Sequence, residues 1–258
     1  MSNSLRVTIV QAHLIWEKIQ QNLDHFTKLL ATIKESTDLV LLPEMFTTGF
    51  SMEAKKLAET IPGPTFSWMK AQAQSLDAAV AGSFIVKEEN QYYNRLLFVR
   101  PDGTTDQYNK RHLFTLAGEH KAYIPGQKNI TIEWKGWKLR PQICYDLRFP
   151  VWSRNTDDYD LIFYLANWPN PRRNHWMSLL AARAIENQAY CIGVNRVGVD
   201  EKGHQYTGDS SVYDYSGLLL TQLTNQEACV TVQLDLEMQK NFRQKLNFLA
   251  DRDTFQVF

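Results

Sequence analysis

The chain has 258 residues, of which 44% are hydrophobic, 12% aromatic and 22% charged. This composition is that of a globular protein, and it excludes collagen-like, mucin-like and coiled-coil chains. Twenty-eight basic residues balance 28 acidic ones, so the long-range positive field that nucleic-acid and membrane-surface binders use is absent. We therefore expect a small neutral or locally charged ligand, and neither nucleic acid nor membrane as a partner.

The apolar runs and the cysteines limit the location and the chemistry. The longest apolar stretch, residues 161–166, is far shorter than the about 20 residues that cross a bilayer. The N-terminus lacks the pattern of a signal peptide, so we expect a cytoplasmic protein. Three widely separated cysteines, Cys144, Cys191 and Cys229, favour neither a disulfide framework nor a zinc site. We expect no metal and no cofactor.

The first half of the chain alternates strand and helix patterns. Residues 5–11 are rich in β-formers, and the apolar positions that follow are spaced by three and four residues, which predicts a helix between Ile15 and Ile33. Residues 39–42 are all apolar, as in a strand buried on both faces, and Glu44 follows them. A second helix is expected to begin at Pro64. Two strands joined in a hairpin are expected over residues 79–86 and 91–100.

The second half continues the same mixture. Two strands are expected at about 130–134 and 138–143, the second ending at Cys144. Residues 161–166 repeat the all-apolar pattern and precede a helix over about 174–187. Further strands are expected at 190–196, 211–215, 217–221 and 229–234. No Pro-, Gly- or Ser-rich linker or fixed repeat interrupts the pattern, so we expect one α/β domain over residues 1–258, with a C-terminal tail from about 236 to 258.

Three reactive side chains follow predicted strands, where α/β sheets gather their functional residues. Glu44 follows residues 39–42, Lys110 follows the hairpin, and Cys144 follows residues 138–143. Taken singly, each has an ordinary structural interpretation: a solvated loop carboxylate, a surface lysine and a packed cysteine. Cys191 and Cys229 lie inside predicted strands, and we interpret both as core residues.

Taken together, the three residues stand in the right order within one set of motifs. The motifs are Leu41-Leu42-Pro43-Glu44-Met45-Phe46 with Thr48-Gly49-Phe50, Tyr108-Asn109-Lys110-Arg111-His112-Leu113-Phe114, Ile143-Cys144-Tyr145-Asp146-Leu147-Arg148-Phe149-Pro150, Gly118-Glu119, Pro125-Gly126, Ala166-Asn167-Trp168-Pro169, Ala181-Ala182-Arg183-Ala184-Ile185-Glu186-Asn187-Gln188 and Gly208-Asp209-Ser210-Ser211. By these motifs the sequence resembles the nitrilase, or carbon–nitrogen hydrolase, superfamily as far as about residue 235. The Cys-Tyr-Asp-Leu-Arg-Phe-Pro and Thr-Thr-Gly-Phe stretches are similar to its omega-amidase branch.

The resemblance implies a four-layer α-β-β-α sandwich and a Glu-Lys-Cys triad. Amide hydrolysis needs a nucleophile, a proton carrier and a group that holds the oxyanion. Cys144 would be the nucleophile, and its place at a strand-to-helix turn predicts that the thiolate is favoured. Glu44 would carry the proton. Lys110 and the N–H of Tyr145 would hold the oxyanion, and Lys110 would keep Glu44 ionised.

Further residues have both a functional and a structural interpretation. Glu119 matches the family position that borders the site and helps to place the substrate and Lys110, or it is a loop carboxylate. Arg148 would bind a substrate carboxylate, or form an ion pair with a nearby aspartate. Phe50 and Trp168 would line an apolar wall, or belong to the core. Arg172 and Arg173 are weaker carboxylate candidates, for which an exposed surface position is favoured.

The omega-amidase resemblance implies a small-molecule amide substrate, a monoamide of a short dicarboxylic acid such as 2-oxoglutaramate or 2-oxosuccinamate, with water as the second reactant. An N-carbamoyl amino acid amidohydrolase would use the same triad, and nitrile hydrolysis is less favoured. The resemblance also implies a homodimer.

Other classes remain possible on the sequence alone. A Cys–His peptidase would need His112, His120 or His175 beside Cys144, although the usual flanking motifs are absent. A dinucleotide enzyme would need a glycine-rich turn where Gln11-Ala12-His13 stands. A catalytically silent binding protein on the same fold is the alternative outside enzymes.

Overall fold

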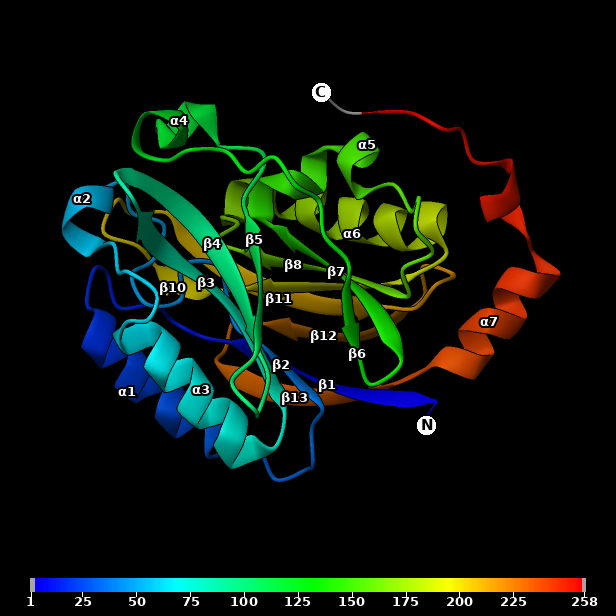
Figure 1. The fold of residues 1–258 in the computed structure, drawn as a ribbon, viewed down its shortest axis with the longest axis horizontal. Helices are drawn as coiled ribbons and strands as arrows, with labels where there is room; N and C mark the ends of the chain where they lie inside the picture. Colours follow the sequence, from blue (N-terminus) through cyan, green and yellow to red (C-terminus); the bar gives the residue numbers. More distant parts are fainter. Residues whose placement is uncertain (1–2, 257–258) are drawn as a thin grey trace.

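The computed structural model describes residues 3–256, whose strands form two sheets placed face to face (Figure 1). The first sheet has the order β13 (Ala228–Asp235), β1 (Ser4–Gln11), β2 (Leu39–Leu41), β3 (Ala79–Glu88), β4 (Gln91–Val99) and β5 (Thr105–Asn109). The second has the order β10 (Val197–Val199), β11 (Gln205–Tyr213), β9 (Tyr190–Asn195), β8 (Leu161–Ala166), β7 (Trp137–Ile143) and β6 (Ile132–Trp134), and β12 (Leu219–Thr224) pairs with β11.

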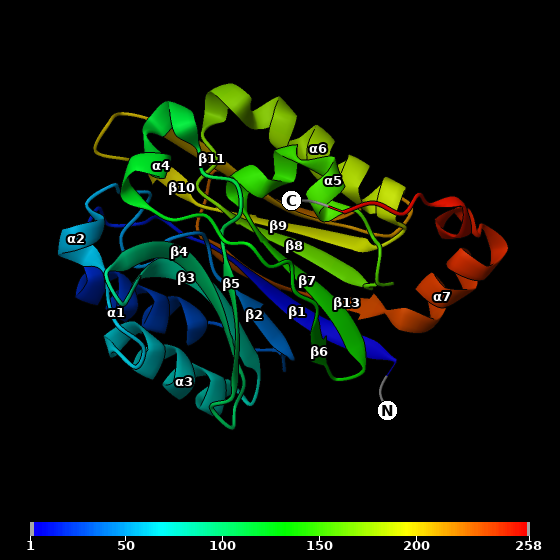
Figure 2. The same cartoon turned by 45° about the horizontal axis from the view of Figure 1, so that its top comes forward.

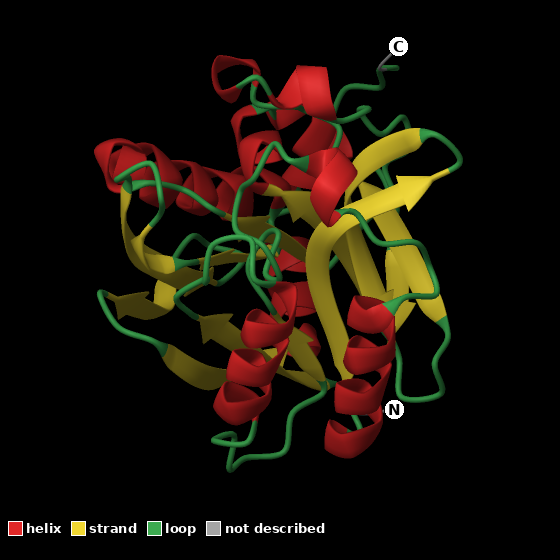
Figure 3. Ribbon diagram, turned by 90° about the vertical axis from the view of Figure 1, so that its left-hand side faces the viewer, coloured by secondary structure: helices red, strands yellow, loops and turns green. Residues whose placement is uncertain are grey.

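Helices cover the outer face of each sheet. Helices α1 (Ile19–Leu30) and α3 (Pro64–Leu76) pack on the first sheet, and α6 (Arg173–Asn187) packs on the second (Figure 2). The side view shows the same succession of helix, strand, strand and helix (Figure 3). The four-layer α-β-β-α sandwich expected from the sequence is confirmed. Every helix within residues 3–256 is too short or too polar to span a bilayer.

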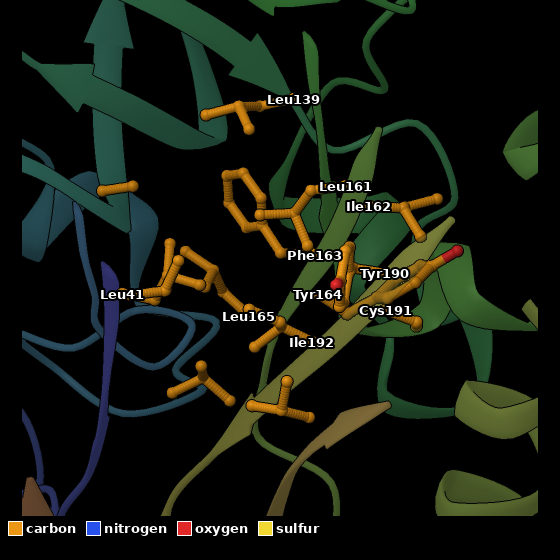
Figure 4. Close-up of a cluster of buried hydrophobic side chains, with 14 of the residues drawn as sticks. Leu41, Leu139, Leu161, Ile162, Phe163, Tyr164, Leu165, Tyr190, Cys191 and Ile192 are labelled. Atoms are coloured by element: carbon orange, nitrogen blue, oxygen red, sulfur yellow. The ribbon is translucent and has the colours of Figure 1, made fainter. Parts of the chain in front are cut away.

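The core between the sheets is built by the all-apolar strands. Leu41 of β2 faces Phe163 and Leu165 of β8, whereas Ile162 and Tyr164 point to the opposite face of β8, toward α6 (Figure 4). All of these side chains are buried. Because β8 is covered on both faces, its sequence is continuously apolar rather than alternating.

Several boundaries differ from the expectations. The helix expected from Ile15 begins only at Ile19, because the Ile15 N–H donates to the side chain of Asn22 at 2.8 Å. The strands expected at 211–215 and 217–221 are β11 and β12, and Asp214 caps the turn between them. The short polar strand β5 and the three-residue strand β10 were not predicted.

Apart from the helical turn expected at Cys144, the short helices were not predicted. These are α2 (Ala54–Leu57), α4 (Glu119–Ala122), α5 (Pro150–Ser153) and the 3-10 helices η1 (Thr115–Ala117), η2 (Cys144–Arg148), η3 (Asn170–Arg172) and η4 (Phe248–Asp251). The expected tail contains α7 (Leu236–Lys245) as well as η4, and residues 257–258 lie outside the described residues. Helix α7 is docked through Gln239, whose side-chain amide donates to the Asp160 carbonyl at 2.8 Å.

The strand directions bring the predicted reactive residues to one edge of the sandwich. Strands β2 and β3 are parallel, and β5 runs in the same direction because both β3–β4 and β4–β5 are antiparallel. Glu44 and Lys110 therefore follow the same edge of the first sheet. Strands β7, β8 and β9 are parallel, so Cys144 and Asn167 follow one edge of the second sheet.

Candidate active site

A cavity of about 420 Å³ opens where these edges meet. Its lining includes six of the residues predicted from the sequence: Phe50, Lys110, Cys144, Tyr145, Arg148 and Trp168. Glu44 and Glu119 lie behind Lys110, and both are fully buried. The structure thus brings all eight predicted site residues together.

Lys110 is held between two buried carboxylates. Its Nζ donates to Glu44 Oε1 at 2.8 Å and to the two oxygens of Glu119 at 2.9 and 3.0 Å. Burial alone would lower the pKa of Lys110, but Glu119 and Glu44 raise it above its ordinary value, so the ammonium stays charged. Burial raises the pKa of Glu119, although Lys110 opposes this shift. Glu119 is therefore not a solvated loop residue.

The Lys110 loop is also fixed through its backbone. The Gly126 N–H donates to the Lys110 carbonyl at 2.8 Å. A Cβ at position 126 would lie 2.1 Å from the carbonyl oxygen of Asn109, so only glycine permits this close approach. The Pro125-Gly126 motif thus packs directly against the segment that carries the lysine.

Two asparagines orient Glu44, and neither was predicted to have a role. The Asn94 side-chain amide donates to Glu44 Oε1 at 2.9 Å, and the Asn167 backbone N–H donates to Oε2 at 2.9 Å. The Asn167 side chain also donates to the Glu44 carbonyl at 2.6 Å. Asn167 belongs to the motif Ala166-Asn167-Trp168-Pro169, so the sequence contained a signal that could have placed it at the site. Asn94 lies within β4, where nothing in the pattern distinguishes it.

Cys144 begins the 3-10 helix η2 with a left-handed backbone conformation, φ +42°. This conformation is uncommon for a non-glycine residue and places a sharp turn directly after β7. The residue is 9% exposed, and its Sγ lies 4.0 Å from the Asn167 carbonyl oxygen. Cys191 is buried in β9, as predicted, whereas Cys229 in β13 is only half-buried.

The expected preference for the thiolate at Cys144 is wrong for this structure. Burial, and next the negative charge of Glu44, raise the pKa of the Cys144 thiol well above its ordinary value, although Lys110 acts in the opposite direction. The helix that follows the cysteine is a 3-10 helix of five residues, too short for a strong helix dipole. This raised pKa favours the neutral thiol, so a nearby base is needed to take its proton.

Two guanidinium groups reach the cavity. Arg148 lies over the Trp168 ring, 4.7 Å from its centroid, and its Nη2 is 3.1 Å from His175 Nδ1. Arg172 lies 5.2 Å from the Phe114 centroid and lines the same cavity. Burial, and then the charge of Arg172, lower the pKa of Arg148, as expected for neighbouring like charges. Within the described residues, neither guanidinium forms an ion pair with a carboxylate.

These positions correct two structural interpretations. Arg148 does not pair with a nearby aspartate, and Arg172 is not merely a surface residue. Arg173, in contrast, forms a two-pronged ion pair with Asp209 at 2.7 and 2.8 Å, so its role is structural. The adjacent arginines differ because η3 ends at Arg172 and α6 begins at Arg173.

The aromatic residues form the wall that was predicted. The Phe50 ring centroid lies 5.0 Å from Lys110 Nζ, and Trp168 supports Arg148. Tyr145 packs its ring against Phe114 and lines the cavity beside Cys144. Tyr206 and Asp200 complete the opposite side, from a hairpin that the sequence did not connect with the site.

The three histidines considered for a Cys–His peptidase make other contacts, and His204, which lines the cavity, pairs with Asp200. The His112 ring bonds to Asp146, His175 contacts Arg148, and His120 lines a different cavity. The Cys–His alternative thus has no support from these contacts. Within the described residues, no cluster of three or more His, Cys, Asp or Glu side chains could hold a metal ion.

Comparison with known proteins gives the same assignment as the motifs. A model of the family described as carbon-nitrogen hydrolase matches residues 6–244. The chain belongs to this family. Omega-amidase YafV of Yersinia enterocolitica is 46% identical to this carbon-nitrogen hydrolase over 256 residues, 98% of each chain. The 2-oxoglutaramate amidase of Bacillus subtilis is 31% identical over 250 residues, 95% of this chain and 96% of that one.

A solved structure shows the same fold over the entire length. The crystal structure of XC1258 from Xanthomonas campestris, a CN-hydrolase superfamily protein with an arsenic adduct in the active site, superposes on this carbon-nitrogen hydrolase with a TM-score of 0.97. The two chains are 41% identical, and the match covers 100% of each.

Proposed function

We propose that this carbon-nitrogen hydrolase is an omega-amidase, which cleaves the terminal amide of a short dicarboxylic monoamide to ammonia and the dicarboxylate. The observation that carries the proposal is the pair Arg148 and Arg172, in the same cavity as Cys144 and Lys110. Guanidinium forks that lack a carboxylate partner suit the distal carboxylate of such a substrate.

The relatives support this substrate class. Proteins named omega-amidase and 2-oxoglutaramate amidase match nearly the full chain. A 2-oxo dicarboxylic monoamide, such as 2-oxoglutaramate or 2-oxosuccinamate, would place its amide at Cys144 and its carboxylate at the arginines. The cavity of about 420 Å³ is ample for a molecule of this size.

In the first half of the reaction, Glu44 takes the proton from Cys144 as Sγ attacks the amide carbon. The S–C bond forms, and the carbonyl oxygen becomes an oxyanion. Lys110 faces this charge, and the N–H of Tyr145 adds a second donor, because the first N–H groups of a helix have no partner within it. The C–N bond then breaks, Glu44 returns the proton to the departing nitrogen, and ammonia leaves behind a thioester.

In the second half, Glu44 takes a proton from water, and the hydroxide attacks the thioester carbon. A second oxyanion forms at the same donors. The C–S bond breaks, Glu44 returns its proton to the sulfur, and the acid is released. Glu119 holds Lys110 in place through both halves by its hydrogen bonds to Nζ.

An ammonia-release screen tests the proposal. Purified full-length protein is incubated with omega-amides, N-carbamoyl amino acids and nitriles, with Cys144→Ala as the matched blank. We expect the highest kcat/KM with the omega-amides. Preferred turnover of N-carbamoyl amino acids would assign the runner-up function, and no turnover by wild type of any of them would favour the silent binding protein.

Three broader expectations remain proposals: the homodimer rests on the family resemblance, and the single domain and the cytoplasmic location rest on the sequence pattern. We propose that residues 1–258 fold as one carbon-nitrogen hydrolase domain, that the protein is a homodimer and that it acts in the cytoplasm. Analytical ultracentrifugation tests the oligomeric state, a single thermal transition seen equally by fluorescence and circular dichroism tests the domain count, and cell fractionation tests the location.

A further inference from the structure

The buried carboxylate of Asp146 joins the segments that carry Lys110 and Cys144. Its Oδ1 accepts the His112 backbone N–H at 2.9 Å and lies 2.8 Å from His112 Nδ1. Its Oδ2 accepts the Tyr108 hydroxyl at 2.8 Å and the Ile143 N–H at 3.0 Å. Asp146 is fully buried and does not line the cavity.

The partners of Asp146 are placed on both sides of the reactive residues. Tyr108 and His112 stand two positions before and after Lys110, and Ile143 directly precedes Cys144. These segments follow β5 and β7, which belong to different sheets. Within the described residues, the β-bridge between the two sheets joins His13 to Val197 and does not involve either of these segments. Side-chain contacts such as those of Asp146 therefore help to set the spacing between the Lys110 and Cys144 loops.

The groups around Asp146 are themselves fixed. The His112 ring stacks on Phe149 with centroids 3.6 Å apart and planes inclined by 5°. The Trp152 indole N–H donates to the Tyr108 hydroxyl at 3.0 Å. With His112 protonated at Nδ1, the carboxylate receives four hydrogen bonds, so its position is closely determined.

We propose that Asp146 is a positioning residue that sets the geometry between the Lys110 ammonium and the Cys144 thiol during turnover. The part of this proposal that is tested by kcat rests on the proposed amidase function. Asp146→Asn keeps the shape of the side chain but replaces one acceptor by an NH₂ group, which faces donors. The Lys110 loop or the Cys144 turn must then shift, and a displacement of about 1 Å can cost roughly 10²-fold in rate.

The kinetic experiment separates positioning from a merely structural role. For Asp146→Asn we expect kcat for an omega-amide to fall at least about tenfold, with KM within about threefold of wild type. The partly exposed carboxylate of Asp106, which lies on β5 like Tyr108 and pairs with Arg100, supplies the control Asp106→Asn, which should retain both constants. His112→Phe keeps the backbone N–H and a stackable ring but loses one bond, so we expect a smaller fall in kcat.

Amide hydrogen exchange provides a readout that needs no substrate. In Asp146→Asn we expect faster exchange confined to residues 108–114 and 143–148. A kcat within twofold of wild type, a change only in KM, or faster exchange throughout the chain would overturn the proposal. If Asp146→Asn does not fold, His112→Phe decides by the same criteria. If wild type hydrolyses no amide, the proposed function fails, and the exchange pattern alone decides on Asp146.

Discussion

Replacing Arg148 with alanine tests whether the cavity recognises a carboxylate. Arg148 is half-buried, and within the described residues its polar side-chain contact is His175. If it binds the distal carboxylate in the ground state and the transition state alike, its loss weakens binding and largely spares the chemical step. A hydrogen bond to a charged group contributes about 1.5–3 kcal/mol, which corresponds to roughly a 10- to 150-fold rise in KM. Because Arg172 remains, we expect the lower part of this range.

The assay compares two amides that differ only at the distal end. Succinamate carries the carboxylate, and butyramide has a methyl group in its place. For Arg148→Ala we expect KM for succinamate to rise about 10- to 50-fold, with kcat changed less than about threefold. The kcat/KM for butyramide should stay within about twofold, since that substrate has nothing for the guanidinium to bind.

Two further variants make the interpretation specific. Arg172→Ala should act in the same direction, because Arg172 lines the same cavity. Arg154→Ala is the matched control, since this guanidinium contacts the Glu186 carbonyl away from the cavity. Equal losses for succinamate and butyramide, or unfolding of Arg148→Ala, would show that Arg148 is structural, and the preference for omega-amides would lose its residue-level support.

Four other predictions address the nucleophile, the charged cluster, metals and stability. Cys144→Ala should abolish turnover in a folded protein and Cys191→Ala should not, as measured by ammonia release and circular dichroism; the reverse result would assign the wrong cysteine. Glu44→Gln should lower kcat by at least about 10²-fold through loss of the proton acceptor. Lys110→Met should lower kcat by roughly 10²–10³-fold. This variant should also have a lower melting temperature, because two buried carboxylates lose their cation. Dialysis against EDTA should leave activity intact, and a loss that zinc or manganese restores would contradict the metal-free mechanism. Burial alone would raise the pKa of Asp38, but its bonds with Arg6 and Lys135 lower it from 3.8 to about 2. The ionised carboxylate therefore stabilises the fold fully above pH 3.8, and this stabilisation is lost as the pH falls toward 2. Asp38→Asn should lower the free energy of unfolding in urea by about 1–2 kcal/mol at pH 7 and by about half of that at pH 3, and an equal loss at both pH values would contradict the prediction.

The fold and the triad could be predicted because they depend on local patterns. All-apolar runs such as residues 161–166 mark strands covered on both faces, and Glu44 follows such a run after one proline. Cys144 follows the mixed strand β7, so the family motif rather than an apolar run identified it. Short elements gave no comparable signal. The polar strand β5 is recognisable only by its pairing with β4, and α7 is held by long-range bonds such as that of Gln239 to Asp160.

The charge states of the site could not be predicted, because they depend on contacts between the two sheets. The turn after β7 suggested a thiolate, yet Glu44 from the first sheet raises the pKa of the thiol together with burial. The structural pairing of Arg173 and the open position of Arg172 were likewise indistinguishable in sequence. The partner that separates them, Asp209, lies 36 positions further along the chain.

In the proposed mechanism, the neutral thiol and the buried charged cluster allow a proton to move without adding a net charge to the buried site. Before reaction, Glu44 and Glu119 face one ammonium, and the raised pKa of Cys144 favours a neutral thiol. When Glu44 takes the thiol proton, it loses its negative charge at the moment when the substrate oxygen gains one. The total charge of the cavity does not change, so no additional ion has to be desolvated. Lys110 is then released from part of its attraction to Glu44 and remains held by Glu119. It can therefore face the oxyanion without moving, which is the condition for preorganised stabilisation of a transition state.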